Sequence, residues 1–448
     1  MLTPVATLGA LRDDGILRRV VANGAWLVGA TGIAACLGAL QGVVIARTLG
    51  VAGFGTVGLV VAFVNVFGRL TSFRMHEFVI QYVSRYEAGD QSSRAAAIKF
   101  AVGVEVAAAV LAYAILWLAA PLGARWFVHN PEAAVLIRLY GVVVLAGLVS
   151  ETSQGILQLY GRYARYSAAS TFGAAASFGG IVAAAILGHG LIGVVAGLVA
   201  GALVTGSILA ASAFVEVRRR LGARWWTARL DALRARWRQV LLFVSSTNVS
   251  ATLSMIAKDG DVLWLGLFRS PTEAGLFRLA YSLAGLVFLP LGSLVQSIYP
   301  ELARQAAHRQ WDEFRRLARR ATRLAATYVV PAAVVVGAIS LPLIGFVYGR
   351  EFVPAVPALL ILLTGMGFAN VFFWARPALL ALHRPEYQTR VAFALVVIKL
   401  AGVFTLVPLT GYLGSAALAI AIYIPGAAIL VWKVRRVVAE AQRQKAVA

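Results

Sequence analysis

The chain has 448 residues, of which 60% are hydrophobic and only 13% are charged. So little charge cannot cover the surface of a water-soluble protein of this length, and the composition therefore excludes an ordinary soluble enzyme. Most of the surface must instead face lipid. Because backbone groups in lipid must pair within their own segment, the long apolar stretches predict membrane-spanning helices.

We predict an all-α, polytopic membrane protein whose helices form two parallel six-helix bundles around a central cavity. Its twelve spans, in chain order, are 25–47, 54–83, 95–120, 132–157, 167–187, 190–215, 239–267, 275–298, 321–347, 355–382, 390–408 and 412–434. The predicted segments are a cytosolic N-terminal segment (1–24), a first bundle (25–215), a basic cytosolic linker or interfacial helix (216–238), a second bundle (239–434) and a basic cytosolic tail (435–448).

The formal net charge of +22 would suggest nucleic acid in a soluble protein, but its distribution points to topology instead. Thirty arginines and lysines fall in one set of loops and termini, and only Arg125, Arg269 and Arg350 fall in the opposite loops. Since positive residues are retained on the cytoplasmic side, both termini are predicted to be cytoplasmic. No nucleic-acid partner is expected, and the positive loops suit anionic lipid headgroups.

The two halves carry similar short motifs at nearly one offset. Ala52–Gly55 follows the first span and Ala274–Phe277 follows the seventh, 222 residues later. Gly161-Arg162 and His383-Arg384 repeat this offset, and Leu191–Gly193 and Tyr412–Gly414 differ by 221. Six spans is an even number, so both halves enter from one side and the repeat is parallel.

Several charged residues lie within or at the ends of predicted spans, where a charge is costly unless it meets a partner or a wet cavity. Near span ends the simpler explanation is a side chain that reaches to the interface. We predict that six cations contribute to a central cavity: Arg47, Arg69, Arg74, Lys258, Arg376 and Lys399.

Polar side chains share faces of these spans. Asn65, Arg69, Ser72 and His76 are spaced 4, 3 and 4 residues apart, as on one face of a continuous helix. The alternative is hydrogen bonding between helices. Polar residues that are predicted to face the same cavity are Gln41, Asn65, His76, Gln154 and Asn248, and the candidates for ion coupling are Asp259, Asp261 and Glu77.

Catalytic patterns are absent from the sequence. The five histidines are dispersed, none forms a metal-ligating HExxH pair, and no Gly-Lys pair provides a nucleotide-binding loop. We therefore predict no enzyme activity, no catalytic residue, no bound metal and no cofactor.

A set of loose motifs, distinctive in their order, covers nearly the whole chain. The first half contains Ala46–Gly50, Gly53–Gly55, Val79–Val83 and Gly89-Asp90; the second contains Asp261–Gly266, Glu273–Phe277, Ala280-Tyr281, Tyr299–Leu302, Tyr348–Phe352, Tyr412–Gly414 and Ala416-Ala417. With these the chain resembles the oligosaccharide and O-antigen flippase family of the multidrug/oligosaccharidyl-lipid/polysaccharide exporter superfamily. One departure is Thr71–Glu77, where many members carry an Asp-Leu-Gly-like stretch.

The resemblance implies a flippase that moves a polyprenyl-pyrophosphate-linked oligosaccharide from the cytoplasmic to the outer leaflet by alternating access. The product would be O-antigen (lipopolysaccharide), capsule or exopolysaccharide. The implied location is the inner membrane, and the implied partners are the lipid-linked oligosaccharide, membrane lipids and polysaccharide polymerase or export machinery. The six cations would meet the pyrophosphate, and the amides and His76 would meet the sugars.

Three alternatives stay open at this point. The chain could be a small-molecule or drug exporter of the same superfamily, coupled to H⁺ or Na⁺ through Asp259 or Asp261. It could be a lipid II flippase, although such proteins often have two further spans. A non-transporting membrane partner of a polysaccharide polymerase belongs to another class.

Overall fold

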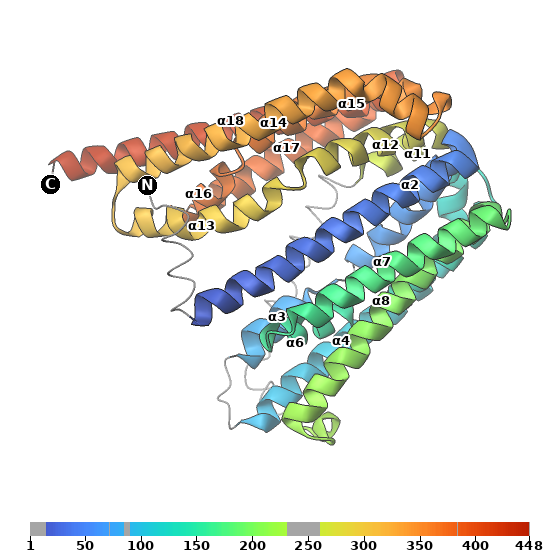
Figure 1. The fold of residues 1–448 in the computed structure, drawn as a ribbon, viewed down its shortest axis with the longest axis horizontal. Coiled ribbons are helices and arrows are strands. Elements are labelled where there is room, and N and C mark those ends of the chain that lie inside the picture. The colour runs from blue at the N-terminus through green and yellow to red at the C-terminus, as the bar shows by residue number, and fades with distance from the viewer. Residues whose placement is uncertain (1–14, 71, 85–89, 231–259, 383, 448) are drawn as a thin grey trace. The chain divides into compact units, whose positions relative to one another are not determined.

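The computed structural model describes residues 15–70, 72–84, 90–230, 260–382 and 384–447, and within those ranges it contains helices and turns but no strand. The chain divides into two compact units (Figure 1). Unit 1 comprises residues 1–48, 63–124 and 130–255, and unit 2 comprises residues 49–62, 125–129 and 256–448. The predictions for Asn248, Lys258 and Asp259 lie outside the described residues, as does most of the predicted seventh span.

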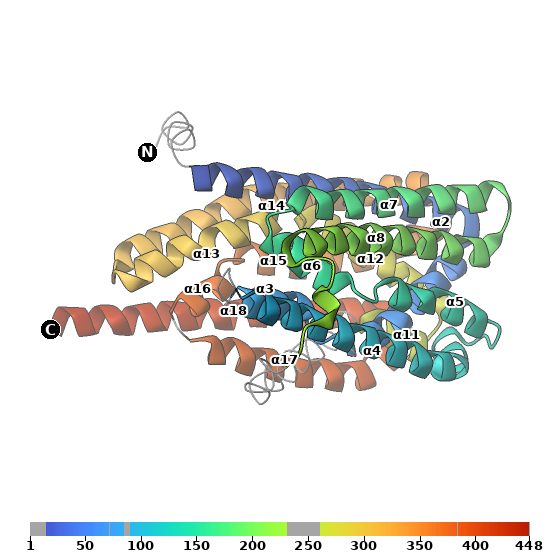
Figure 2. The same ribbon diagram turned by 90° about the horizontal axis from the view of Figure 1, so that it is seen from below.

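Unit 1 begins with α2, whose central part belongs to unit 2. Its helices are α2 (Gly15–Leu70), α3 (Met75–Val83), α4 (Gln91–Gly123), α5 (Ala133–Ala146), α6 (Ser150–Leu159), α7 (Tyr163–Ile186), α8 (Gly190–Leu221) and the 3₁₀ turn η2 (Trp225–Thr227). A short π-helix, η1 (Ala124–Val128), extends α4, and its residues after Ala124 belong to unit 2. Figure 2 shows α7 beside α8, and apolar residues of α3, α4, α6 and α8 form a buried core.

Unit 2 contains the remaining helices and the central part of α2. They are α11 (Asp261–Phe268), α12 (Pro271–Phe288), α13 (Leu291–Ala307), α14 (Trp311–Val347), the 3₁₀ turn η3 (Arg350–Ala355), α15 (Val356–Val371), α16 (Ala375–Ala381), α17 (Pro385–Thr405) and α18 (Val407–Val447). A second buried core joins α13, α14, α16 and α18.

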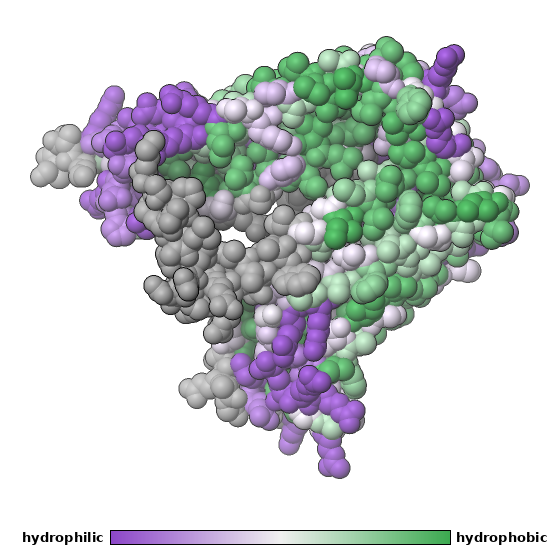
Figure 3. All heavy atoms as spheres, viewed as in Figure 1, coloured by the Kyte–Doolittle hydropathy of each residue, from purple (hydrophilic) through white to green (hydrophobic). Residues whose placement is uncertain are grey.

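Nine stretches among the described residues are long and apolar enough to cross a membrane. One of them, Gly29–Val83, overlaps the 56-residue α2, which is too long for a single crossing and is broken at Gly50 (φ 65°). Hydrophobic side chains cover the middle of the helices, and hydrophilic side chains gather at their ends (Figure 3). The predicted all-α membrane fold with about twelve helices is confirmed.

Among the described residues, four predicted spans are interrupted well inside their bounds. The second is interrupted between α2 and α3, the fourth at Gly147–Val149, the eighth at Leu289-Pro290 and the tenth at Phe372–Trp374. The sequence prediction of a continuous second span was wrong, because Arg74 adopts a left-handed conformation (φ 50°) ahead of α3. The helical spacing that placed Asn65, Arg69, Ser72 and His76 on one face therefore does not apply across this break.

The order of elements repeats between the two halves of the chain. The N-caps of α4 and α14 are Asp90 and Gln310, with φ of −86° and −87° and ψ of 68° and 65°. Left-handed Gly190 precedes the body of α8, and left-handed Gly411 precedes the main part of α18. These matched positions are 220 and 221 residues apart, which agrees with the offset of the sequence motifs.

The basic segment after the sixth span differs from its predicted form. Helix α8 continues to Leu221, six residues into the segment predicted as a linker or interfacial helix. Gly222 then ends it with a positive φ of 82°, and the chain makes only a short 3₁₀ turn at Trp225–Thr227. The first arginines of this segment thus belong to the end of a membrane helix.

Two motif glycines make a close backbone contact inside unit 2. A Cβ added to Gly55 of α2 would overlap the carbonyl oxygen of Pro271 and lie 2.9 Å from the nitrogen of Gly275 in α12. A Cβ added to Gly275 would lie 2.6 Å from the carbonyl oxygen of Val51. The repeated glycine motifs are therefore needed because helix backbones meet there.

We expect Gly55→Ala to destabilise the protein by about 1–3 kcal/mol, because the added methyl group forces two helix backbones apart. The matched control is Gly285→Ala in α12, where an added Cβ meets nothing within 4 Å. Thermal unfolding in detergent should show a lower midpoint for the first variant and no loss for the second. Equal behaviour of both would contradict the close contact.

Candidate functional site

In unit 1, the breaks of the second and fourth spans lie together. Helix α3 packs against α6, and the Glu151 carboxylate in the first turn of α6 faces the start of α3. It accepts a hydrogen bond from the backbone N–H of Met75 at 2.8 Å and one from the Ser72 hydroxyl at 2.5 Å. The Glu151 carboxylate at the break of the fourth span thus caps α3, the helix that follows the break of the second span.

Glu105 of α4 caps the start of α6 in the same way as Glu151 caps the start of α3. Its two carboxylate oxygens accept the backbone N–H groups of Glu151 at 2.7 Å and of Thr152 at 3.0 Å. The first N–H groups of a helix carry partial positive charge and have no partner within the helix. Two carboxylates are therefore stabilised within the membrane region by helix N-termini, Glu105 at α6 and Glu151 at α3.

The α3 side of this site carries three of the predicted residues. His76 Nε2 lies 3.0 Å from Gln158 Oε1 of α6, and Arg74 Nη1 lies 2.6 Å from Glu77 Oε1. The side chains of Arg74 and Glu77 are each 42% exposed. The structure thus joins a predicted substrate cation and a predicted coupling carboxylate as one ion pair that remains open to a ligand.

The other predicted residues of unit 1 are more scattered. Gln41 of α2 donates to the carbonyl oxygen of Ala174 in α7 at 3.1 Å, which is the helix–helix hydrogen bond that the sequence left open as an alternative. Arg47, Asn65 and Arg69 are exposed along α2, and Gln154 is half-buried on α6.

Unit 2 contains a buried ion pair. Lys399 Nζ of α17 lies 2.9 Å from Asp261 Oδ2 at the start of α11, and the two side chains are only 6% and 11% exposed. The sequence placed both residues within spans but assigned them separate roles, substrate binding for Lys399 and ion coupling for Asp261. Each is instead the other's partner.

Two tyrosines extend this polar cluster. Tyr423 of α18 makes a side-chain hydrogen bond with Tyr281 of α12 and lies within electrostatic range of Asp261 and Arg376. Arg376 of α16 is exposed. The five residues of this cluster come from five different helices, so only the tertiary fold brings the hydroxyls and charges together.

Sequence reasoning missed several of these residues as site components. Glu105 and Glu151 stood out as carboxylates within spans, but nothing in their spacing indicated that each caps a broken helix. Tyr281 lies in a family-like motif, whereas Tyr423 has no distinguishing local pattern. Ser72 was assigned to a helix face that the structure does not form.

Within a polytopic membrane protein, discontinuous helices with polar groups at their breaks are features of transporter folds. The profile of the family described as "Polysaccharide biosynthesis protein" matches residues 20–306. The chain belongs to this family.

The chain is also similar to a bacterial inner membrane protein. The inner membrane protein YghQ of Escherichia coli (strain K12) is 24% identical over 350 residues, which are 76% of this chain and 96% of that protein.

Solved structures show the same fold. The lipid II flippase MurJ in an inward closed conformation matches with a TM-score of 0.74 at 14% identity, over 94% of this chain and 91% of that one. An inward-facing multidrug resistance MATE transporter of the MOP superfamily matches with a TM-score of 0.73 at 13% identity, over 93% and 96%. The predicted resemblance to a polysaccharide family is confirmed by the family match, and these structures show that the chain shares their fold.

Proposed function

We propose that the protein is a flippase that moves a polyprenyl-pyrophosphate-linked oligosaccharide from the cytoplasmic to the outer leaflet of the inner membrane. The steps would follow alternating access, with both termini cytoplasmic, and would serve O-antigen, capsule or exopolysaccharide synthesis. The observation that carries the proposal is membership of a polysaccharide biosynthesis family on a fold shared with a lipid flippase. Neither the family description nor the site points to an enzyme.

Side chains within each unit suit the two parts of such a substrate. A pyrophosphate needs cations, and Arg47, Arg69 and the partly exposed Arg74 lie along α2 and at the start of α3. Sugars need amides, imidazole and aromatic faces. Gln154 and His76 offer these groups in unit 1, and Tyr281 and Tyr423 offer hydroxyls and rings in unit 2.

The proposal is tested with the purified full chain in proteoliposomes and a fluorescent polyprenyl-pyrophosphate-linked oligosaccharide. We expect the protein to accelerate movement between leaflets, with Arg74→Gln and Arg69→Gln slowing it while the amount of inserted protein stays unchanged. If the protein moves no lipid-linked glycan but exports small cationic compounds, the exporter alternative is correct. If it moves neither, a partner role in polymerisation remains.

We also expect an inside-negative membrane potential to stimulate outward flipping. A headgroup with two negative charges moving outward releases about 4.6 kcal/mol at 100 mV, since each charge contributes about 2.3 kcal/mol. The measurement is flipping under a potassium-valinomycin potential with equal pH on both sides. Flipping that ignores the potential and follows a proton or sodium gradient would overturn this prediction.

The contacts of two predicted coupling residues argue against cation coupling through them. The ammonium group of Lys399 occupies the position beside Asp261 that an exchangeable cation would need. Glu77 similarly faces the guanidinium group of Arg74. Coupled export through either carboxylate would require its cationic partner to leave in every cycle.

A further inference from the structure

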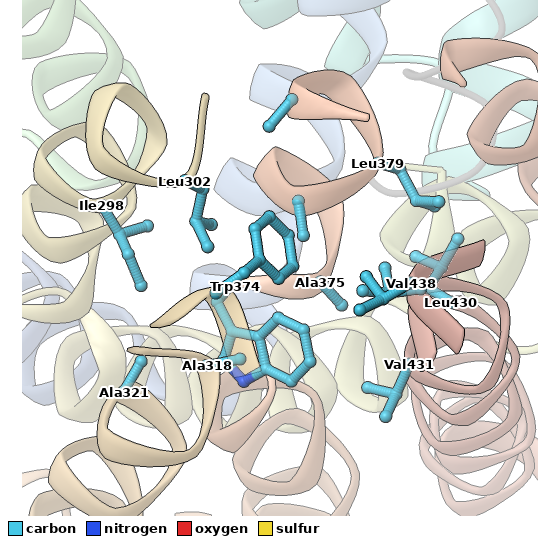
Figure 4. Packing of buried hydrophobic residues seen from close by; sticks show 14 residues of the cluster. Ile298, Leu302, Ala318, Ala321, Trp374, Ala375, Leu379, Leu430, Val431 and Val438 are labelled. Atoms are coloured by element: carbon cyan, nitrogen blue, oxygen red, sulfur yellow. The ribbon is translucent and has the colours of Figure 1, made fainter. Parts of the chain in front are cut away.

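Unit 2 contains a second site that the proposed transport cycle does not use. A pocket of about 650 Å³ lies between the first three turns of α14, the break before α16 and the later part of α18. Its floor is apolar and belongs to the buried core around Trp374, which Figure 4 shows beside Ala318 and Val438. Its rim carries four arginines: Arg315, Arg319, Arg323 and Arg435.

Trp374 has a fixed position in this floor. Its indole N–H donates to the Thr322 hydroxyl at 2.7 Å, and that hydroxyl donates to the carbonyl oxygen of Ala318 at 2.9 Å. The side chain is almost fully buried, with 4% exposed. The pocket therefore has a rigid apolar floor, whereas the arginines at its rim are exposed.

The arginines of the rim differ from their neighbours in sequence. Arg316, adjacent to Arg315, pairs with Glu313 at 2.7 Å, and Arg436, adjacent to Arg435, pairs with Glu440 at 2.8 Å. None of the four rim arginines forms an ion pair with a carboxylate in the described part of the chain. Two of the neighbouring arginines, Arg316 and Arg436, thus have acidic partners within the protein, whereas the four arginines that line the pocket can take up another anion.

The position along α14 indicates where that anion comes from. The helix has 37 residues, about 55 Å at 1.5 Å per residue, whereas the hydrocarbon core is roughly 30 Å thick. The pocket is lined by residues within the basic first thirteen positions of α14. This part of the helix must project from the hydrocarbon into the headgroup layer. The charge distribution predicts that this end is cytoplasmic.

We infer that this pocket binds an anionic phospholipid of the cytoplasmic leaflet. The arginines would hold the phosphate with charge-assisted hydrogen bonds, and the first carbons of an acyl chain would lie against Trp374 and its apolar neighbours. A free inorganic anion would not need the apolar floor. A protein partner would not need a pocket within the headgroup layer. The inference concerns a lipid that is bound and not transported, so it does not rest on the proposed function.

The test uses the full chain in detergent, titrated with phosphatidylglycerol and, as reference, phosphatidylcholine, with bound lipid measured by native mass spectrometry. The pocket variant is Arg315→Gln/Arg319→Gln/Arg435→Gln. Its matched control, Arg316→Gln/Arg320→Gln/Arg436→Gln, removes the same charge from the same helices. We expect phosphatidylglycerol to bind at least tenfold more weakly to the pocket variant and within about twofold of wild type to the control.

Several results would overturn the inference. Equal weakening in both variants would mean that general surface charge attracts the lipid, and equal binding of both lipids would remove the need for an anion. Displacement of phosphatidylglycerol by polyprenyl diphosphate, lost in the pocket variant, would make the pocket a substrate site instead. The single variant Arg319→Glu, with its unfolding midpoint measured without lipid, separates lost binding from lost folding: weaker binding with an unchanged midpoint supports the inference.

Discussion

Replacing Lys399 by methionine is expected to destabilise the protein by about 3–5 kcal/mol, because it leaves the Asp261 carboxylate buried without its cation. Both side chains are almost inaccessible, so water cannot replace the lost partner. The measurement is unfolding of the detergent-solubilised protein by heat and by denaturant. This is the largest stability effect that we expect from any single substitution in unit 2.

The double variant Asp261→Leu/Lys399→Met should recover most of this loss, since two apolar side chains need no compensation for charge. The exposed pair of Arg316 and Glu313 is the matched control, and breaking it should cost less than about 1 kcal/mol. A loss in the double variant equal to the sum of the losses in Lys399→Met and Asp261→Leu would show that the two residues are not energetically coupled.

Glu151→Ala is expected to destabilise the protein by roughly 1–3 kcal/mol, because it removes the acceptor of the Met75 N–H. The change also removes the hydrogen bond from the Ser72 hydroxyl to Glu151. Since α3 also carries Arg74 and His76, the same change should lower glycan flipping by displacing them. Unfolding midpoints and transport rates of reconstituted protein are the two measurements.

Glu105 provides the comparison. Glu105→Gln keeps one acceptor oxygen but places an amide N–H₂ group against a helix N–H, so it should also destabilise the break. Glu105 holds the turn that carries Glu151. The double variant Glu105→Gln/Glu151→Ala should therefore lose less stability than the sum of the losses in the two single variants. The exposed Glu132→Gln is the control for loss of charge alone, and additive losses would argue against a linked pair of caps.

The sequence was informative where the signal is summed over many residues. Long apolar stretches predicted the helical membrane fold, and the motif offset predicted the repeated element order that Gly190 and Gly411 display. The breaks were missed because the polar residues beside them, within 69–77 and 150–154, were assigned to faces of continuous helices. At Arg74 and at Gly147–Val149 only a few residues leave the helical conformation, which spacing alone does not reveal.

The sequence could not predict which residues of the site pair with one another, and the reason is different. Lys399 and Asp261 are 138 residues apart, and a charge within a span indicates that some partner exists without naming it. Glu105 and Glu151 take backbone N–H groups as partners, which no side-chain pattern records. Arg74, by contrast, was identified as a site candidate, and its partner Glu77 lies one helical turn away.

The caps of the broken helices also have a consequence for biosynthesis. Helix α3 has only nine residues, too few to cross the hydrocarbon unaided, and its first N–H is satisfied by a carboxylate 76 residues further along the chain. At about 5–20 residues per second, a ribosome needs roughly 4–15 s to produce that carboxylate. We therefore expect the second span to enter the bilayer unfinished and to reach its final form only after the fourth span has left the translocon.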